Sequence, residues 1–125
     1  TGTNLLKEYG INHVLTVCHE QRPEPVEGIS YYYFPIWDKQ TEELQTILPQ
    51  THECIDNARK QNQKILVHCL GGISRSGAVC ISYIMKEKKQ KFLPTWRQCK
   101  EKRAVIHPNE GFKEQLTIFE SKISL

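Results

Sequence analysis

The chain has few aspartates and no long apolar segment. Only Asp38 and Asp56 occur among its 125 residues, so few acidic side chains other than glutamate are available for catalysis. No stretch approaches the roughly 18 uninterrupted apolar residues of a membrane-spanning helix, and no basic, apolar leader opens the chain. With 38% apolar residues the chain can bury one core. We therefore expect a single soluble domain over residues 1–125.

Paired cysteine and histidine motifs are also missing. Neither Cys-x2-Cys nor His-x3-His occurs, so we expect no metal site and no other cofactor. The cysteines are odd in number and irregularly spaced, which favours reduced thiols over a disulfide framework. They are Cys18, Cys54, Cys69, Cys80 and Cys99. Reduced thiols predict a cytoplasmic location, with the nucleus as the alternative.

Strand-like and helical segments alternate along the chain. Apolar and β-branched runs predict strands at 14–18, 31–36 and 64–68. Helical periodicity and helix-start residues predict helices near 4–9 and at 42–61, 76–88, 94–102 and 110–121, with Pro49 kinking or restarting the second of them. This order predicts an α/β fold in which a central, mostly parallel sheet is flanked by helices. Ligands of such sheets bind beyond the carboxyl ends of the strands.

The segment with the clearest chemistry is HCLGGISRSG at residues 68–77. It follows a buried strand and precedes a helix, so its backbone N–H groups can point at an anion from the helix N-terminus. Arg75 supplies a planar fork that can hold two phosphate oxygens. A helix N-terminus and a cation lower the pKa of a nearby thiol from about 8.5 to roughly 3.5–7.5. We therefore predict a phosphate pocket with Cys69 as a thiolate nucleophile.

This loop resembles the Cys-x5-Arg-Ser/Thr signature of the cysteine-dependent protein phosphatases, in the form typical of their dual-specificity branch. The matching residues are His68, Cys69, Gly72, Ser74, Arg75 and Ser76. Further similarity runs from about Leu5 to Glu120 and includes YFPI at 33–36 and RAVIHPNEGF at 103–112. Members of this family usually open with one more strand ahead of the segment that matches Leu5 to Gly10. The resemblance implies a dual-specificity catalytic domain that lacks this strand.

Cleavage of a phosphate ester requires a general acid, because the departing oxygen is a poor leaving group unless it is protonated. Asp38 follows the second predicted strand on a loop that could cover the pocket, and its spacing from Cys69 resembles that of the family's acid. Asp38 or Thr41 could instead cap the following helix. Glu42 and Glu43 are alternative acids. Asp56 lies within a predicted helix and reads as an exposed charge.

The resemblance also implies roles for neighbouring residues. Ser76 would donate a hydrogen bond to the departing thiolate when water hydrolyses the cysteinyl phosphate, and His68 would orient the loop and support the thiolate by hydrogen bonding. Ser74 or Ser76 could also cap the helix that follows. Phosphate would be bound by the loop itself, through Leu70, Gly71, Gly72, Ile73, Ser74 and Arg75.

The substrate is expected to be a phosphorylated protein, with phosphotyrosine, phosphoserine and phosphothreonine all as candidates. Relatives that act on phosphoinositides tend to carry lysines in the loop, whereas residues 70–74 are uncharged here. Two alternatives remain: a lipid or RNA 5′ phosphatase with the same chemistry, and a phosphoprotein-binding module with little turnover. Tyr31, Tyr32 and Tyr33 read as packing residues rather than a nucleic-acid surface. We expect neither nucleic acid nor a membrane as a partner.

One segment is strongly basic. Residues 86–103 contain eight lysines and arginines against two glutamates, namely Lys86, Lys88, Lys89, Lys91, Arg97, Lys100, Lys102 and Arg103. Such a segment can attract acidic phosphopeptides or anionic surfaces. We favour the simpler interpretation that it is an ordinary solvated helix face.

Overall fold

The computed structural model describes residues 2–71 and 73–123. Over these residues the chain alternates strands and helices in the predicted order. The strands are β1 (Ile11–Val17), β2 (Ser30–Phe34) and β3 (Lys64–His68). The helices are α1 (Gly2–Glu8), α2 (Leu48–Lys60), α3 (Arg75–Lys88), α4 (Phe92–Lys102) and α5 (Glu110–Lys122).

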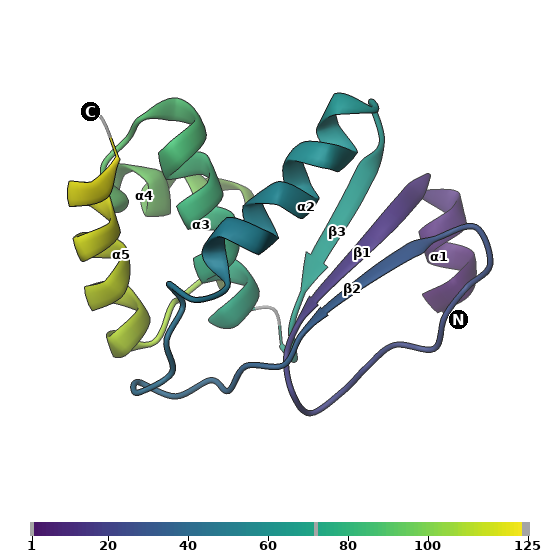
Figure 1. Ribbon diagram of the computed structural model, residues 1–125, viewed down its shortest axis with the longest axis horizontal. Helices are drawn as coiled ribbons and strands as arrows, with labels where there is room; N and C mark the ends of the chain where they lie inside the picture. Colours follow the sequence, from purple (N-terminus) through teal and green to yellow (C-terminus); the bar gives the residue numbers. More distant parts are fainter. Residues whose placement is uncertain (1, 72, 124–125) are drawn as a thin grey trace.

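The described strands form one parallel sheet in the order β2-β1-β3. Val14 of the central strand β1 is level with Tyr31 on one side and with Leu66 on the other. Because all three strands run the same way, their carboxyl ends meet at one edge (Figure 1). The loops that follow β1, β2 and β3 therefore meet there, which is where parallel α/β sheets bind ligands. The predicted fold class is confirmed.

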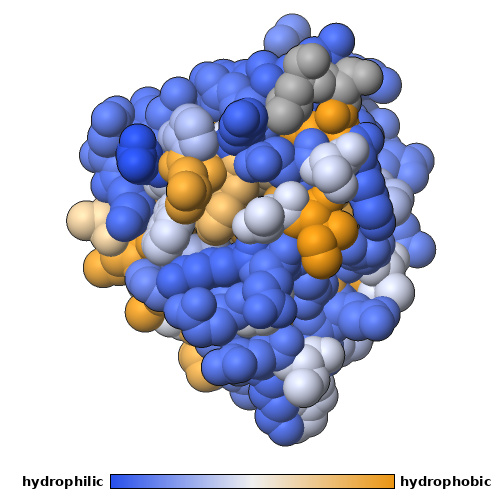
Figure 2. All heavy atoms as spheres, turned by 90° about the vertical axis from the view of Figure 1, so that its left-hand side faces the viewer, coloured by the Kyte–Doolittle hydropathy of each residue, from blue (hydrophilic) through white to orange (hydrophobic). Residues whose placement is uncertain are grey.

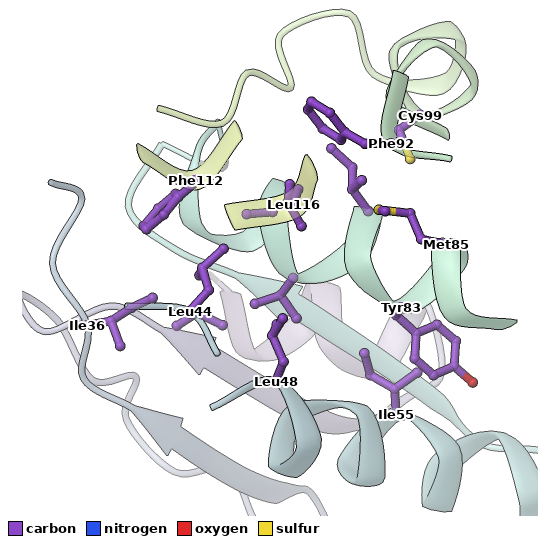
Figure 3. Packing of buried hydrophobic residues seen from close by; sticks show 14 of the residues in the cluster. Ile36, Leu44, Leu48, Ile55, Tyr83, Met85, Phe92, Cys99, Phe112 and Leu116 are labelled. Atoms are coloured by element: carbon purple, nitrogen blue, oxygen red, sulfur yellow. The ribbon is translucent and has the colours of Figure 1, made fainter. Parts of the chain in front are cut away.

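Helices α2 to α5 lie on one side of the sheet and α1 on the other (Figure 1). The core between the sheet and the larger helical layer draws side chains from nearly every element (Figure 3). Helix α3 runs through its middle and buries nine of its residues. No described helix is long and apolar enough to cross a membrane.

The helix predicted over 42–61 begins later, at Leu48. Pro49 lies in its first turn, where a missing N–H costs nothing. The preceding segment is held in turns by α5, because Gln115 accepts the N–H of Leu44 at 2.7 Å and donates to the carbonyl of Glu42 at 2.7 Å. The sequence signal for a helix was correct, and long-range contacts displaced its start.

Smaller differences concern the element ends. Strand β2 spans Ser30–Phe34 rather than 31–36, since Pro35 cannot donate to a ladder. Helix α4 begins at Phe92, two residues before Pro94, and the carboxylate of Glu120 accepts the Phe92 N–H at 2.7 Å. Helix α3 begins at Arg75. The last helix presents Phe112 and Leu116 to the core, as predicted.

The three consecutive tyrosines are half-buried, and their hydroxyls bond within the chain. Tyr31 accepts the N–H of Val26 at 2.8 Å, Tyr32 lies 3.1 Å from Nδ1 of His13, and Tyr33 donates to the carbonyl of His19 at 3.3 Å. They tie β2 to the β1–β2 loop and to β1.

Candidate active site

The loop from Cys69 to Ser74 connects the end of β3 to the start of α3. Gly71 has a φ of +80°, which residues with a side chain rarely adopt, so glycine takes this conformation without strain. Gly72, predicted to bind phosphate, lies outside the described residues. The loop leads directly into the first turn of α3, whose backbone N–H groups lack helical partners. These groups favour an anion beside Cys69.

Cys69 and Ser76 face one another. Both residues are buried, and Sγ of Cys69 lies 3.2 Å from Oγ of Ser76. Ser76 is the second residue of α3, so the helix fixes its hydroxyl beside the sulfur. The arrangement places a hydroxyl beside the sulfur, where it can donate a hydrogen bond to a thiolate.

Arg75 is 2% exposed, and Glu20 holds its guanidinium. Nη2 donates to Oε2 of Glu20 at 2.9 Å, Nη1 donates to Oε1, and Nη1 also donates to the carbonyl of Ile36 at 3.1 Å. Their side-chain hydrogen bonds, and then their opposite charges, raise the pKa of Arg75 and lower that of Glu20 to about 2. Nε of Arg75 is buried and has no hydrogen-bond partner among the described residues, so its N–H remains to be satisfied by a ligand.

Glu20 was not identified from the sequence. It lies on the loop after β1, three residues beyond the end of that strand. The carboxyl ends of the strands meet at one edge of the sheet, which we call the active edge. A charged residue just after a strand is therefore a candidate site residue on topology alone. In the sequence, however, Glu20 is one of several glutamates in a polar loop, and no neighbouring residue marks it as part of the site.

Asp38 is exposed on the loop after β2. Its Oδ1 accepts a hydrogen bond from Nδ2 of Asn109 at 3.0 Å. Asn109 also caps α5, with its Oδ1 accepting the N–H of Phe112 at 2.9 Å, and its own N–H donates to Oγ of Ser74 at 2.9 Å. Asn109 thus joins the loop that bears Asp38 to the loop from Cys69 to Ser74, which we call the signature loop. The sequence did not reveal this role.

The helix-cap reading of Asp38 and Thr41 is wrong, because α2 begins at Leu48 after Ile47. The carboxylate of Glu42, a substitute acid, accepts the N–H of Trp37 at 3.0 Å. Asp56 accepts the hydroxyl of Tyr83 at 2.6 Å, so it is a structural hydrogen-bond acceptor rather than a simple surface charge. Asp38 remains the aspartate on a loop at the active edge.

His68 is bonded to the neighbouring strand. Its Nε2 lies 2.7 Å from Oγ1 of Thr16, and burial lowers its pKa. The ring is therefore neutral at neutral pH and is fixed directly before the nucleophile. Ser74 occupies the N-cap position of α3 but makes no capping bond with its side chain, which instead accepts from Asn109. Leu70 and Ile73 are 51% and 44% exposed, so their side chains lie on the surface around Cys69, which we call the rim.

The family model "Dual specificity phosphatase, catalytic domain" matches residues 1–122. Dual specificity protein phosphatase 1 of Arabidopsis thaliana is 33% identical over 98% of this chain. The chain spans 62% of the length of that protein and 29% of the length of two other relatives.

Two solved structures superpose closely. The human tyrosine phosphatase-like serine/threonine/tyrosine-interacting protein has a TM-score of 0.90 and 31% identity, over 95% of this chain and 82% of its own. A mouse putative dual specificity phosphatase, complexed with zinc tungstate, has a TM-score of 0.90 and 31% identity, over 98% and 77%. Together with the geometry of residues 68–76, these matches show that the chain belongs to the dual specificity phosphatase family.

Proposed function

We propose that this protein removes phosphate from phosphotyrosine and from phosphoserine or phosphothreonine in proteins, through a cysteinyl-phosphate intermediate. The observation that carries the proposal is the buried contact between Cys69 and Ser76 at the N-terminus of α3, next to the charged Arg75. The sulfur nucleophile, the hydroxyl that stabilises it as a leaving group and the phosphate-binding cation come from one loop and the first turn of one helix.

In the first step the thiolate of Cys69 attacks phosphorus, and the bond from phosphorus to the substrate oxygen breaks. Asp38 gives its proton to that oxygen, which leaves as an alcohol or phenol. The free Nε edge of Arg75 and the N–H groups of the helix N-terminus stabilise the charge on the transferring phosphoryl group.

In the second step water attacks the phosphorus of the cysteinyl phosphate. Asp38, now a carboxylate, accepts the proton of the water, and the bond between sulfur and phosphorus breaks. The hydroxyl of Ser76, 3.2 Å from the sulfur, stabilises the thiolate as it leaves. Inorganic phosphate is released and the enzyme returns to its starting state.

A protein substrate is supported by the family, whose matched members are described as protein phosphatases. The loop residues 70–74 are uncharged, which supports a phosphoprotein over a highly charged inositol phosphate. The five free cysteines support a reducing compartment, and the cytoplasm or nucleus is proposed as its location. Microscopy of the tagged protein tests that location.

A phosphoprotein-binding module with slow turnover is the second candidate. The observation in its favour is that Glu20 already holds both terminal nitrogens of the Arg75 fork. A structural neighbour described as phosphatase-like and interacting is consistent with it. The two candidates differ in turnover, which is directly measurable.

The test is hydrolysis of p-nitrophenyl phosphate between pH 4 and 9 without added metal. Cys69→Ser should reduce the rate to background, while Cys54→Ser, the same change at a cysteine outside the site, should retain the parent rate. Asp38→Ala should lower kcat about a hundredfold or more and remove the basic limb of the profile. A folded parent that binds phosphopeptides without turnover would establish the binding module instead.

A further inference from the structure

Two lysines from different helices meet at Trp96. Nζ of Lys100, on α4, lies 4.3 Å from the centre of the Trp96 ring, and Nζ of Lys113, on α5, lies 5.0 Å from it. Hydrophilic side chains cover most of the face on which α4 and α5 lie (Figure 2). We call Trp96, Lys100 and Lys113 the Trp96 platform.

The positive charge of the platform is only partly matched. Lys113 forms an ion pair with Glu110 at 2.9 Å, whereas Lys100 forms none with any described residue. The indole ring attracts both ammonium groups through its quadrupole but carries no net charge. Lys102, the last residue of α4, and Arg103 directly after it add two further cations along the chain. The platform therefore has a positive potential that a carboxylate can neutralise.

The platform is joined to the catalytic loop by short contacts. The indole N–H of Trp96 donates to the carbonyl of Ile106 at 2.9 Å, and the ring meets His107 edge-on at 5.2 Å. The N–H of His107 donates to the carbonyl of Ile73 at 2.8 Å, within the signature loop. From α5, the N–H of Lys113 donates to the carbonyl of Asn109 at 2.9 Å. Residues 106–109 thus connect the platform to the signature loop through hydrogen bonds.

We propose that the Trp96 platform binds acidic residues that flank the phosphorylated residue of a protein substrate. When the phosphate group sits against Cys69, the rest of the peptide must leave the pocket across the rim formed by the signature loop and its neighbours. A carboxylate on that peptide then lies near two ammonium groups held by separate helices. The inference rests on the proposed function and adds the substrate class: acidic phosphoproteins.

The test compares two phosphotyrosyl peptides that differ only in their flanks, one with glutamates and one with glutamines. In the parent, kcat/KM for the acidic peptide should exceed that for the neutral one by about three- to tenfold in low salt, as expected for two exposed ion pairs. The ratio should fall towards one as ionic strength rises, since the Debye length is about 10 Å at 0.1 M salt. In the double variant Lys100→Glu/Lys113→Glu the ratio should drop to one or below.

Lys7→Glu/Lys60→Glu is the matched control, because it makes the same change in net charge on α1 and α2. This control should keep the ratio of the parent. Equal rates on the two peptides in the parent, or an equal loss in the control, would overturn the proposal, as would binding to phosphatidylserine vesicles without a peptide preference. If the parent hydrolyses neither these peptides nor p-nitrophenyl phosphate, the proposed function fails, and the affinities of Cys69→Ser for the same peptides test the platform alone.

Discussion

At the scale of single residues, Arg75 is paired with Glu20, and we expect this pairing to determine how Arg75 binds the phosphate group of a substrate. Arg75 is 2% exposed, and burying its charge costs free energy of folding unless the charge is paired. Glu20 supplies the partner from a loop 55 residues earlier in the chain. The carboxylate takes the terminal nitrogens and leaves Nε free. Glu20 therefore orients the fork and keeps one edge of it available.

Neutralising this carboxylate should weaken catalysis. In Glu20→Gln we expect kcat/KM for p-nitrophenyl phosphate to fall about ten- to a hundredfold, because hydrogen bonds between charged groups are lost and the fork is no longer fixed. Inhibition by inorganic phosphate should weaken in parallel. Glu27→Gln, at an exposed carboxylate on the same loop, is the control. Tighter phosphate inhibition in Glu20→Gln would show instead that Glu20 merely blocks the fork.

At the scale of elements, α5 positions the loop of the candidate acid. A Cβ at Gly111, in the first turn of α5, would lie 1.9 Å from the backbone carbonyl oxygen of Gln40, so only glycine allows this approach. The bonds of Gln115 to the backbone of Glu42 and Leu44 continue the same contact. The loop that bears Asp38 is thus held by a helix far along the chain.

Gly111→Ala should move that loop. We expect kcat to fall towards the Asp38→Ala value with loss of the basic limb of the pH profile, since backbone must shift to relieve the overlap. Thr117→Ala, at an exposed position of the same helix, controls for substitution in α5. Thermal unfolding shows whether the variant is folded. A folded variant with the parent profile would mean that the loop does not need this contact.

A second pair of elements, α2 and α3, meets at a buried histidine. Nε2 of His52 lies 2.8 Å from Oγ of Ser82, whose own proton is donated to the carbonyl of Val79 at 2.7 Å. Nε2 of His52 is therefore the donor. Burial, and then the charge of Lys86, lower the pKa of His52 from 6.5 to about 4.

This lowered pKa predicts a loss of stability in acid. Above pH 6.5 His52 is neutral in both states; between pH 6.5 and 4 the unfolded chain binds a proton that the folded chain does not. The free energy of unfolding should therefore decrease by on the order of 3 kcal/mol as the pH falls through this window. Urea denaturation at several pH values measures it. His52→Gln, which keeps a donor for Ser82, should flatten the slope, and an unchanged slope would assign the effect to other groups.

At the scale of the whole molecule, side chains from the sheet and from the helices pack in one hydrophobic core. Phe112 and Leu116 of α5 are fully buried against side chains from the other elements of this layer (Figure 3). The same residues that complete the core thereby fix the helix that carries the Asn109 cap and the contact with Gln40. Both the stability of the protein and the geometry of the site therefore depend on the contacts of Phe112 and Leu116.

Removing the largest of these side chains should be severe. Phe112→Ala is expected to cost about 3–5 kcal/mol, a large part of the roughly 5–15 kcal/mol that stabilises a domain. Ile118→Ala, on the same helix but 52% exposed, should change stability by less than about 1 kcal/mol. Urea denaturation compares the two. Similar values for both variants would contradict the assignment of Phe112 to the core.

The features predicted well from the sequence are local ones. The strands, the buried character of α3 and the meeting of Cys69 with Ser76 follow from residues close together along the chain, where hydrophobic period and helix geometry determine the outcome. The late start of α2 was missed, because the contacts of Gln115 with the preceding turn are long-range.

The sequence by itself therefore determined the family, the fold class and the segment that brings Cys69, Arg75 and Ser76 together, because eight consecutive positions and one helix turn hold these three residues. Only the tertiary structure decided that Glu20 holds Arg75, that Asn109 binds Asp38 and that two lysines meet at Trp96. Residues 55 and 71 positions apart become neighbours only when packing fixes the elements between them, and no local pattern specifies such contacts.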